Sequence, residues 1–383
     1  MTGILTEEQE LIQKTARDFS RDRLAPGAAA REAAGCIEPD VINEMGKLGF
    51  LGMTVPENQG GIGTDYVSYA LALMEMAAGD GAVSTMMSVH NAPFCAILSR
   101  FASPEQQQRW LTPAAEGAFI GAFALTEPHT GSDAAAIKCS AQRSASGYVL
   151  NGSKQFITSA RIAGGIVAFA VTDKDAGKKG ISAFYIEPGG QGFTVGAPEH
   201  KLGQKASDTC TLTFDSLEVE PSHLIGEEGQ GLAIALSSLE TGRIGIAAQS
   251  VGMAQAALDV AVVYAQDRVT FGKPIAQHQA VAFRLADMDM QVEAARQLVL
   301  NAARLKDSGA PCLREASIAK LFASQMAERV VSDAIQTLGG YGYLADFPLE
   351  RIYRDVRVCQ IYEGTSDVQR INISRELLGG RAR

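Results

Sequence analysis

Beyond Gly231, apolar residues recur at three- and four-residue intervals through three long stretches with little interruption. Such spacing places them on one face of an α-helix, and long helices of this kind bury their apolar faces by packing against one another. The stretches cover residues 244–265, 281–299 and 318–338, and a shorter helical segment follows near the C-terminus. The pattern predicts a four-helix bundle in residues 228–383.

The middle of the chain has a different texture, with short β-type runs separated by Gly, Asn and Lys. Residues 166–171, 182–186 and 210–214 are rich in β-branched and aromatic side chains. The Asn-Gly pair at 151–152 lies between apolar runs and predicts a hairpin turn. Because no long helical periodicity separates the runs, we expect an antiparallel β domain in residues 118–227 rather than a βαβ sheet.

The first part of the chain, residues 1–117, is predicted to be helical. Thr6 and Gln9 have the spacing of a capping box, and apolar residues follow at helical intervals. A loop with Pro and Gly interrupts this pattern at 56–61, and a helix resumes over 66–78. The fold class is therefore α+β, with an N-terminal α-helical domain, a central antiparallel β domain and a C-terminal four-helix bundle.

The charge and cysteine patterns exclude several functional classes. A net charge of −9 with no cluster of Lys and Arg argues against nucleic acid as a partner. The acidic N-terminus and the lack of a long apolar run predict neither secretion nor membrane insertion, so we expect a cytoplasmic protein. The six cysteines include no CxxC pair, and no group of His, Cys and carboxylates has metal-ligand spacing, so no metal is expected.

One carboxylate stands in a setting suited to catalysis. Glu363, followed at once by Gly364, lies in a polar loop between an Arg-rich helix end and another helix. A carboxylate positioned there can act as a general base, and the glycine gives a ligand close access to the backbone.

Two segments of the β region combine polar and aromatic groups. Pro128 and Gly131 predict a turn whose amides and hydroxyls can cradle a phosphate or a flavin edge, although on the turn alone an ordinary ST-type turn is the simpler interpretation. Phe156 and Thr158 share one face of a predicted strand, which taken singly indicates only a half-buried strand. No GxGxxG sequence follows a strand, so a Rossmann nucleotide fold is not expected.

Three features of the bundle region are open to a functional or a structural interpretation. Arg268 lies between the first two bundle helices, and its guanidinium can donate two parallel hydrogen bonds to a pyrophosphate. In the structural interpretation, its positive charge neutralises the negative end of its own helix dipole. The glycine run of 336–342 ends the third helix as an ordinary C-cap and also leaves backbone that a ligand can reach. Glu240 and Arg243, at the start of the first bundle helix, have the spacing of a surface i,i+3 pair.

In their order and chemistry, these segments resemble the acyl-CoA dehydrogenase family across nearly the whole chain. The most specific matches are ALTEPHTGSD at 124–133, NGSKQFIT at 151–158, RVTFG at 268–272, QTLGG at 336–340 and IYEGT at 361–365. The resemblance implies FAD bound between the β domain and the bundle. It also implies that an adjacent subunit completes the site, in a homotetramer built as a dimer of dimers.

The resemblance further implies roles for individual residues, with Glu363 as the catalytic base. The residues expected to bind FAD are Phe123, Leu125, Thr126, Gly131, Ser132, Phe156, Ile157, Thr158, Arg268, Phe271, Gln279, Gln336, Gly339, Gly340, Thr365 and Asp367. Those in 268–340 are expected to reach the FAD of the neighbouring subunit. The residues expected to contact the acyl-CoA are Ser132, Glu240, Arg243 and Gly364.

The implied reaction is an FAD-dependent α,β-dehydrogenation of an acyl-CoA thioester to a trans-2-enoyl-CoA, as in fatty acid β-oxidation. Electrons are expected to pass to an electron-transferring flavoprotein. Some family members carry the base on the helix, one position before Arg243. That position here is Gly242, which leaves Glu363 as the only candidate. Gly242 and the segment 86–90 resemble short-chain and branched-chain members.

The chain departs from the common family pattern at three positions. Phe156 stands where many relatives have Trp, Glu240 replaces a common Asp, and Asp367 replaces a common Gln or Glu. Two other interpretations share the fold. An acyl-CoA oxidase would pass electrons to oxygen, but such oxidases are usually longer chains. A non-catalytic relative would be expected to lack the base or the FAD-binding loop, and this chain has both.

Overall fold

The computed structural model describes residues 5–379 and begins with a helical region. Its helices are α1 (Glu7–Phe19), α2 (Ala28–Ala34), α3 (Pro39–Lys47), α4 (Tyr66–Gly79), α5 (Gly81–Val89), α6 (Ala96–Phe101), α7 (Pro104–Gln106) and α8 (Thr112–Ala115). The predicted capping box is confirmed: Thr6 Oγ1 accepts from the Gln9 N–H at 3.2 Å, and Gln9 Oε1 accepts from the Thr6 N–H at 3.0 Å.

The central region is a single sheet. Its strands are β1 (Ile120–Ala124), β2 (Ser140–Ser144), β3 (Gly147–Thr158), β4 (Ala163–Val171), β5 (Ile181–Ile186), β6 (Phe193–Val195), β7 (Thr209–Val219) and β8 (Leu224–Ile225). The order is β6-β7-β3-β2-β4-β5-β8, with β1 paired to β4. Most pairs are antiparallel as expected, but β1 and β2 each run parallel to β4.

The predicted hairpin at Asn151-Gly152 is wrong, because both residues lie inside β3. The turn between β2 and β3 instead falls where Ser144 pairs with Gly147. The side-chain oxygen of Asn151 accepts the Ser216 N–H at 2.8 Å, beside a register shift in the β3–β7 pair. The Asn151 side chain thus provides an acceptor for a backbone N–H at an irregularity of the strand pair. An Asn-Gly pair occurs at such irregularities as well as in turns, so the pair alone does not distinguish them.

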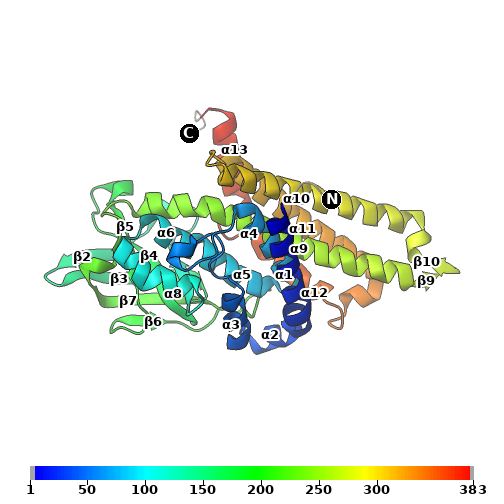
Figure 1. The fold of residues 1–383 in the computed structure, drawn as a ribbon, viewed down its shortest axis with the longest axis horizontal. Coiled ribbons are helices and arrows are strands. Elements are labelled where there is room, and N and C mark those ends of the chain that lie inside the picture. The colour runs from blue at the N-terminus through cyan, green and yellow to red at the C-terminus, as the bar shows by residue number, and fades with distance from the viewer. Residues whose placement is uncertain (1–4, 380–383) are drawn as a thin grey trace.

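The C-terminal region contains the three long helices predicted from the apolar spacing. Its elements are α9 (Gly231–Asp267), β9 (Val269–Thr270), β10 (Lys273–Pro274), α10 (Gln279–Asp307), α11 (Leu313–Leu338), α12 (Leu349–Val356) and α13 (Ser366–Leu377). Figure 1 shows the sheet at one end of the elongated molecule and the β9–β10 hairpin at the other, with the N-terminal helices between them.

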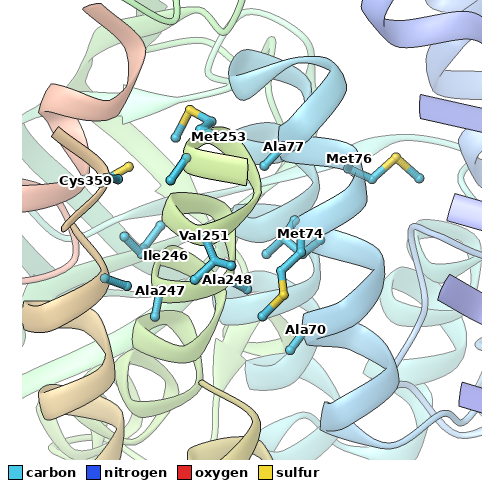
Figure 2. Packing of buried hydrophobic residues seen from close by; sticks show 14 of the residues in the cluster. Ala70, Met74, Met76, Ala77, Ile246, Ala247, Ala248, Val251, Met253 and Cys359 are labelled. Carbon is cyan, nitrogen blue, oxygen red and sulfur yellow. The ribbon is translucent and has the colours of Figure 1, made fainter. Parts of the chain in front are cut away.

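The main apolar core joins the N-terminal helices to the bundle. Figure 2 shows Met74 and Ala77 of α4 beside Ala248 and Val251 of α9, and all four side chains are at most 2% exposed. Their burial removes apolar surface from water, at roughly 25 cal/mol per Å². Helix α9 also packs against α10 and α11, so its middle lies in the core between the N-terminal helices and the rest of the bundle.

Among residues 5–379, α9 alone is long and apolar enough to cross a membrane when only length and composition are considered. However, 67% of its most apolar window is buried in the fold, which is also what the core helix of a soluble protein shows.

Candidate active site

The loop that carries Glu363 has an unusual backbone. It connects a 3₁₀ turn at Arg357–Gln360 to α13, and Glu363 and Gly364 are consecutive residues with φ of 51° and 88°. Holding a non-glycine residue in this left-handed region costs on the order of 1–3 kcal/mol. The loop therefore depends on contacts with its surroundings to keep this conformation.

The Glu363 carboxylate is cut off from solvent. Both of its oxygens are buried, and neither has a hydrogen-bond partner within residues 5–379. Burial raises the pKa of this carboxyl to about 7, while the positive charges of Lys320 and Arg243 act in the opposite direction. A buried carboxyl group with a pKa near neutrality is well suited to accept a proton.

Helix α9 passes directly beside this carboxylate. A Cβ at Gly242 would lie 1.8 Å from Glu363 Oε2 and 2.7 Å from its Cδ. Any side chain at position 242 would therefore displace the carboxylate. The sequence shows that Gly242 has no side chain that could act as a base. The structure adds that the missing side chain leaves room for the Glu363 carboxylate.

The structure corrects the interpretation of Glu240 and Arg243 as a surface pair at a helix start. Both lie well inside α9, which begins at Gly231. Glu240 accepts from Lys306 Nζ at 3.2 Å and from Cys312 Sγ at 3.3 Å. Arg243 is only 6% exposed, and its Nε and Nη1 have no hydrogen-bond partner among the described residues.

Burial lowers the pKa of the Arg243 guanidinium, with the nearby Glu363 and Glu240 charges opposing that shift. Buried donors of this kind are nearly always satisfied in native proteins, by protein, water or ligand. The N–H groups of Arg243 that lack a partner, close to Glu363, are therefore available to acceptors from water or from a ligand.

In the β domain, two segments expected to bind FAD lie side by side. The Gln155 N–H donates to the Thr126 carbonyl at 2.8 Å, and Lys154 Nζ donates to the Leu125 carbonyl at 3.2 Å. The ring of Phe123, on β1, packs edge-on against Phe169 with 5.2 Å between ring centres. Residues far apart in the sequence thus form one surface.

A bulge in β3 determines how Phe156 is presented. The register with β7 shifts between Lys154 and Ile157, and Phe156 has a φ of 59°. Its ring is 63% exposed, whereas Ile157 is 2% exposed and belongs to the core of the sheet. Thr158, half-buried, pairs with Thr209. The strand is therefore not the regular one that the sequence indicates, and it presents an aromatic face to solvent.

A buried ion pair holds this surface together. Lys154 is 0% exposed, and its Nζ lies 2.7 Å from Glu127 Oε1. The Glu127 carboxylate also accepts the N–H groups of Lys138 at 2.7 Å and Cys139 at 3.0 Å. The loop that runs from Glu127 to Cys139 is thereby anchored to β3 at both ends.

The predicted turn is found at Pro128, but it closes at Thr130 and does not include Gly131. Glu127 and Thr130 exchange backbone hydrogen bonds of 3.0 and 3.1 Å, and Thr130 Oγ1 donates to the Asp133 carbonyl. Gly131 and Ser132 follow the turn and are exposed. Both are therefore accessible to a ligand on the β-domain surface.

A second group of predicted FAD residues gathers at the end of the bundle. Arg268, Gln336, Gly339 and Gly340 line a cavity of about 560 Å³. The Arg268 guanidinium lies 5.6 Å from the centre of the Tyr341 ring. A guanidinium, an amide and open glycine backbone form a donor set that suits a phosphate group.

Two more predicted residues lie near this cavity but point outward. Phe271, at the tip of the β9–β10 hairpin, is 97% exposed, and Gln279 is exposed at the start of α10. Helix α9 separates the hairpin from the sheet. With 37 residues, the helix is about 55 Å long. The sheet and the hairpin lie at opposite ends of the molecule (Figure 1), so one copy cannot bring both groups to the same ligand.

The two predicted residues that follow Glu363 and Gly364 belong to the start of α13. Thr365 is its N-cap, with Oγ1 accepting the Val368 N–H at 3.4 Å. Asp367 is exposed and pairs with Arg370 at 2.8 Å. Neither residue forms a hydrogen bond with the Glu363 carboxylate.

Sequence reasoning missed two residues that contact the loop around Glu363, namely Lys320 and Gln369. Lys320 stands on α11 among the buried alanines at 316, 319, 323 and 327. A lone lysine on an apolar helix face is the signal that could have identified it, because a buried ammonium needs partners. Among residues 5–379, no group of three or more His, Cys, Asp or Glu side chains is placed to hold a metal ion.

Three family models match the chain in order. They describe the acyl-CoA dehydrogenase N-terminal domain (residues 6–118), middle domain (122–217) and C-terminal domain (229–378). A protein named "Acyl-CoA dehydrogenase" from Bacillus subtilis is 48% identical, over 98% of this chain and 99% of its own length. The rat protein named "Short-chain specific acyl-CoA dehydrogenase, mitochondrial" is 43% identical, over 98% of this chain and 91% of its own.

Solved structures agree with these matches. The butyryl-CoA dehydrogenase of Megasphaera elsdenii superposes with a TM-score of 0.96 at 42% identity, covering 99% of this chain and 100% of that one. A chain from a structure described as the electron transferring flavoprotein of Acidaminococcus fermentans superposes with a TM-score of 0.97 at 44% identity, with the same coverage.

Proposed function

The chain belongs to the acyl-CoA dehydrogenase family, and from that premise we propose that it desaturates short-chain acyl-CoA thioesters with Glu363 as the base. The observation that carries the assignment of the base is the buried, unpartnered carboxylate of Glu363 against Gly242. The reaction class follows from the family, and the short-chain preference is supported by the names of the rat and Megasphaera relatives.

The residues of this chain fit the family's cofactor, FAD. On the β domain, the exposed ring of Phe156 can cover a flat aromatic group beside Thr126 and Thr158. At the bundle end, Gly339 and Gly340 have no atom within 4 Å of where a Cβ would stand, so their backbone is open to a ligand. We propose that the first surface holds the flavin and that the second holds the phosphates of another copy's FAD.

The other residues predicted to contact FAD or acyl-CoA take the following roles in the proposed enzyme. Phe123, Leu125, Gly131, Ser132 and Ile157 shape the β-domain surface around the flavin. Arg268, Phe271, Gln279 and Gln336 act on the neighbouring copy's FAD, and Thr365 and Asp367 on its adenosine side. Ser132, Glu240, Arg243 and Gly364 contact the acyl-CoA, with the unpartnered Arg243 N–H groups as the donors that most need acceptors.

In the proposed mechanism, Glu363 removes a proton from the carbon next to the thioester carbonyl. Bound FAD would supply the acceptor for the hydride that leaves the β carbon, and loss of the proton and the hydride together gives a trans-2-enoyl-CoA. The carbonyl oxygen gains negative charge as the proton leaves, and a positioned backbone donor stabilises that charge. The Glu363 N–H can serve, since it donates to no acceptor within residues 5–379. Removing one such donor typically costs about 3 kcal/mol in transition-state stabilisation.

The rate is expected to depend on the protonation of Glu363. The pKa of this carboxyl is raised to about 7 by burial, so below that pH the substrate-free protein carries a neutral acid that cannot accept a proton. We therefore expect kcat/KM to rise through pH 7 along a one-proton limb, because kcat/KM reports the free enzyme. The measurement is kcat/KM for butyryl-CoA across the pH range in which the fold is stable.

If kcat/KM instead rises with a midpoint near the ordinary pKa of glutamate, this expectation is contradicted, because water would then reach the carboxylate. The control is the flavin absorbance of the protein at each pH, which separates a change in kcat/KM from a change in FAD content.

The separation of the two predicted FAD groups supports an oligomer in which each site is completed by another copy. We propose a homotetramer arranged as a dimer of dimers, as the family resemblance implies. We also propose a cytoplasmic enzyme whose electrons pass to an electron-transferring flavoprotein, a partner suggested by the Acidaminococcus structure.

The function is tested most directly by colour. Purified protein is expected to be yellow, with FAD bound, and to lose its flavin absorbance under anaerobic conditions when butyryl-CoA is added. A series of straight and branched acyl-CoAs then ranks the substrates, and added electron-transferring flavoprotein should restore the colour. Protein that stays colourless after FAD is supplied, or that no acyl-CoA bleaches, would refute the proposed function.

A further inference from the structure

The base loop, residues 362–364, is held by a buried lysine. Lys320, on α11, is 0% exposed, and its Nζ donates to the Tyr362 carbonyl at 2.9 Å and to the Gly364 carbonyl at 2.6 Å. These two carbonyls flank Glu363 on either side. The Lys320 ammonium therefore bonds to the backbone on both sides of Glu363, whose own backbone lies in the strained left-handed region.

A second buried side chain contacts the same backbone. Gln369, on α13, is 0% exposed, and its Nε2 donates to the Gly364 carbonyl at 2.8 Å and, more weakly, to the Glu363 carbonyl at 3.4 Å. A Cβ at Gly364 would lie 2.8 Å from that Nε2, so only glycine allows this close contact. The carbonyls of three successive residues are thus fixed by donors from two different helices.

The free-energy cost of burying the Lys320 ammonium indicates that its charge has a function at this position. Taking an ammonium out of water costs several kcal/mol even after relaxation. An apolar side chain of similar length would fill the same space in α11 without that cost. Among the described residues, both hydrogen bonds of the ammonium go to the base loop, so its effect is concentrated on the position of Glu363.

We propose that Lys320 is a positioning residue for the base: its buried ammonium fixes the loop of residues 362–364 so that the Glu363 carboxylate lies against Gly242. This inference rests on the proposed function for its catalytic consequence but not for its structural one. Gln369 assists as a neutral donor. Lys320 touches neither substrate nor FAD and acts only through Glu363.

The charge of Lys320 also acts on the protonation of the base. The groups that face Glu363 are Arg243 from α9, Lys320 from α11 and the hydroxyl of Tyr69 from α4. Both cations lower the pKa of the carboxyl against the effect of burial. Burial lowers the pKa of Lys320 itself to about 8, with Cys359 and Glu363 opposing that shift and Arg243 adding to it.

The test compares Lys320→Met, which has a similar length without charge or donors, with Lys320→Arg, which keeps both. Ser317→Ala is the matched control: Ser317 lies one turn earlier on α11, is 0% exposed and accepts from Asn372 of α13 at 3.4 Å. It therefore probes packing between the same two helices without touching the base loop. Glu363→Gln is measured in parallel.

The first readout needs no activity. Hydrogen–deuterium exchange of a peptide covering residues 361–365 is expected to be about tenfold faster in Lys320→Met, because the loop opens more often. In Ser317→Ala it should equal the wild-type rate. Unchanged exchange in Lys320→Met overturns the proposal, whether or not the wild-type protein proves to be a dehydrogenase.

The second readout is kinetic, with butyryl-CoA and a dye acceptor. A misplacement of the base by about 1 Å costs on the order of 10²-fold, so kcat of Lys320→Met should fall by about that factor with KM little changed. Its acid limb should move to higher pH by about one unit, because a cation near the carboxylate is lost. Lys320→Arg should keep the wild-type limb and recover part of kcat.

A merely structural lysine would give a different result: loss of FAD or thermal stability in proportion to lost activity, with the acid limb unmoved. That outcome overturns the proposal. If Lys320→Met does not fold with FAD, Lys320→Gln replaces it, and the same shift of the limb is required. If wild-type protein is not bleached by any acyl-CoA, the proposed function fails, while the exchange experiment still decides the role of Lys320.

Discussion

Glu363→Gln is expected to abolish nearly all turnover while the protein remains yellow. The amide has almost the same size as the carboxyl but cannot accept a proton at any accessible pH. General-base catalysis contributes typically 10²–10⁴-fold, and here no second carboxylate is available at Gly242, so we expect a loss of about 10³–10⁴-fold in kcat. The measurement is kcat with butyryl-CoA, together with the rate at which hydrogen on the α carbon exchanges with deuterated water.

FAD content, thermal stability and binding of butyryl-CoA should stay close to wild type in that variant, because the Glu363 carboxylate makes no hydrogen bond within residues 5–379. The control is Glu376→Gln, a carboxylate exposed near the end of α13, which should have wild-type kcat. A Glu363→Gln enzyme that turns over within a few-fold of wild type would remove this residue from the role of base.

Glu127→Ala is expected to cause the largest loss of stability. It leaves the ammonium of Lys154 buried with only the Leu125 carbonyl, and it also removes the acceptor for the Lys138 and Cys139 N–H groups. Breaking a buried ion pair by removing one partner costs about 3–5 kcal/mol in the free energy of unfolding. Because this pair anchors the turn beside the proposed flavin surface, FAD should also dissociate more readily.

The unfolding can be followed through the single tryptophan. Trp110 is 3% exposed and stacks on Tyr185 of β5 with 4.0 Å between ring centres, so its fluorescence reports the contact between the helical region and the sheet. The matched control is Glu187→Ala, which breaks an exposed ion pair with Arg109. An exposed pair contributes about 0–1 kcal/mol, so equal effects of the two substitutions would contradict the prediction.

Combining Glu127→Ala with Lys154→Met should recover part of the loss, since no unpaired charge then remains buried. The two residues are in contact, so their effects are expected to be non-additive by about 0.5–3 kcal/mol. Strict additivity would show that the pair does not interact as its 2.7 Å separation implies.

Local patterns were sufficient for much of the fold. Three- and four-residue apolar spacing predicted the long helices α9, α10 and α11, and the Thr6–Gln9 spacing predicted the cap of α1 correctly. These patterns succeed because the hydrogen bonds of a helix and its cap join residues only three or four positions apart. The turn at Pro128 was predicted from residue types, but its closure between Glu127 and Thr130, which leaves Gly131 outside, was not.

Local patterns failed where a distant segment decides the conformation. Asn151-Gly152 has the composition of a hairpin turn, yet it continues a strand because Asn151 bonds to Ser216 on β7. Glu240 and Arg243 have the spacing of a surface pair, yet Glu240 bonds to Lys306 on α10 and Arg243 is buried. Neither partner can be read from neighbouring residues.

For the candidate site, the sequence by itself was enough to propose Glu363 as the base, since its segment resembles the catalytic loop of the acyl-CoA dehydrogenases and Gly242 has no side chain. The tertiary structure alone decided how acidic that base is and what holds it. The charges of Lys320 and Arg243, and the hydrogen bonds from Lys320 to the carbonyls on either side of Glu363, come from α11 and α9, two helices that are remote from the loop in the chain. The physical reason is that a pKa depends on distance through space, while a sequence records only distance along the chain.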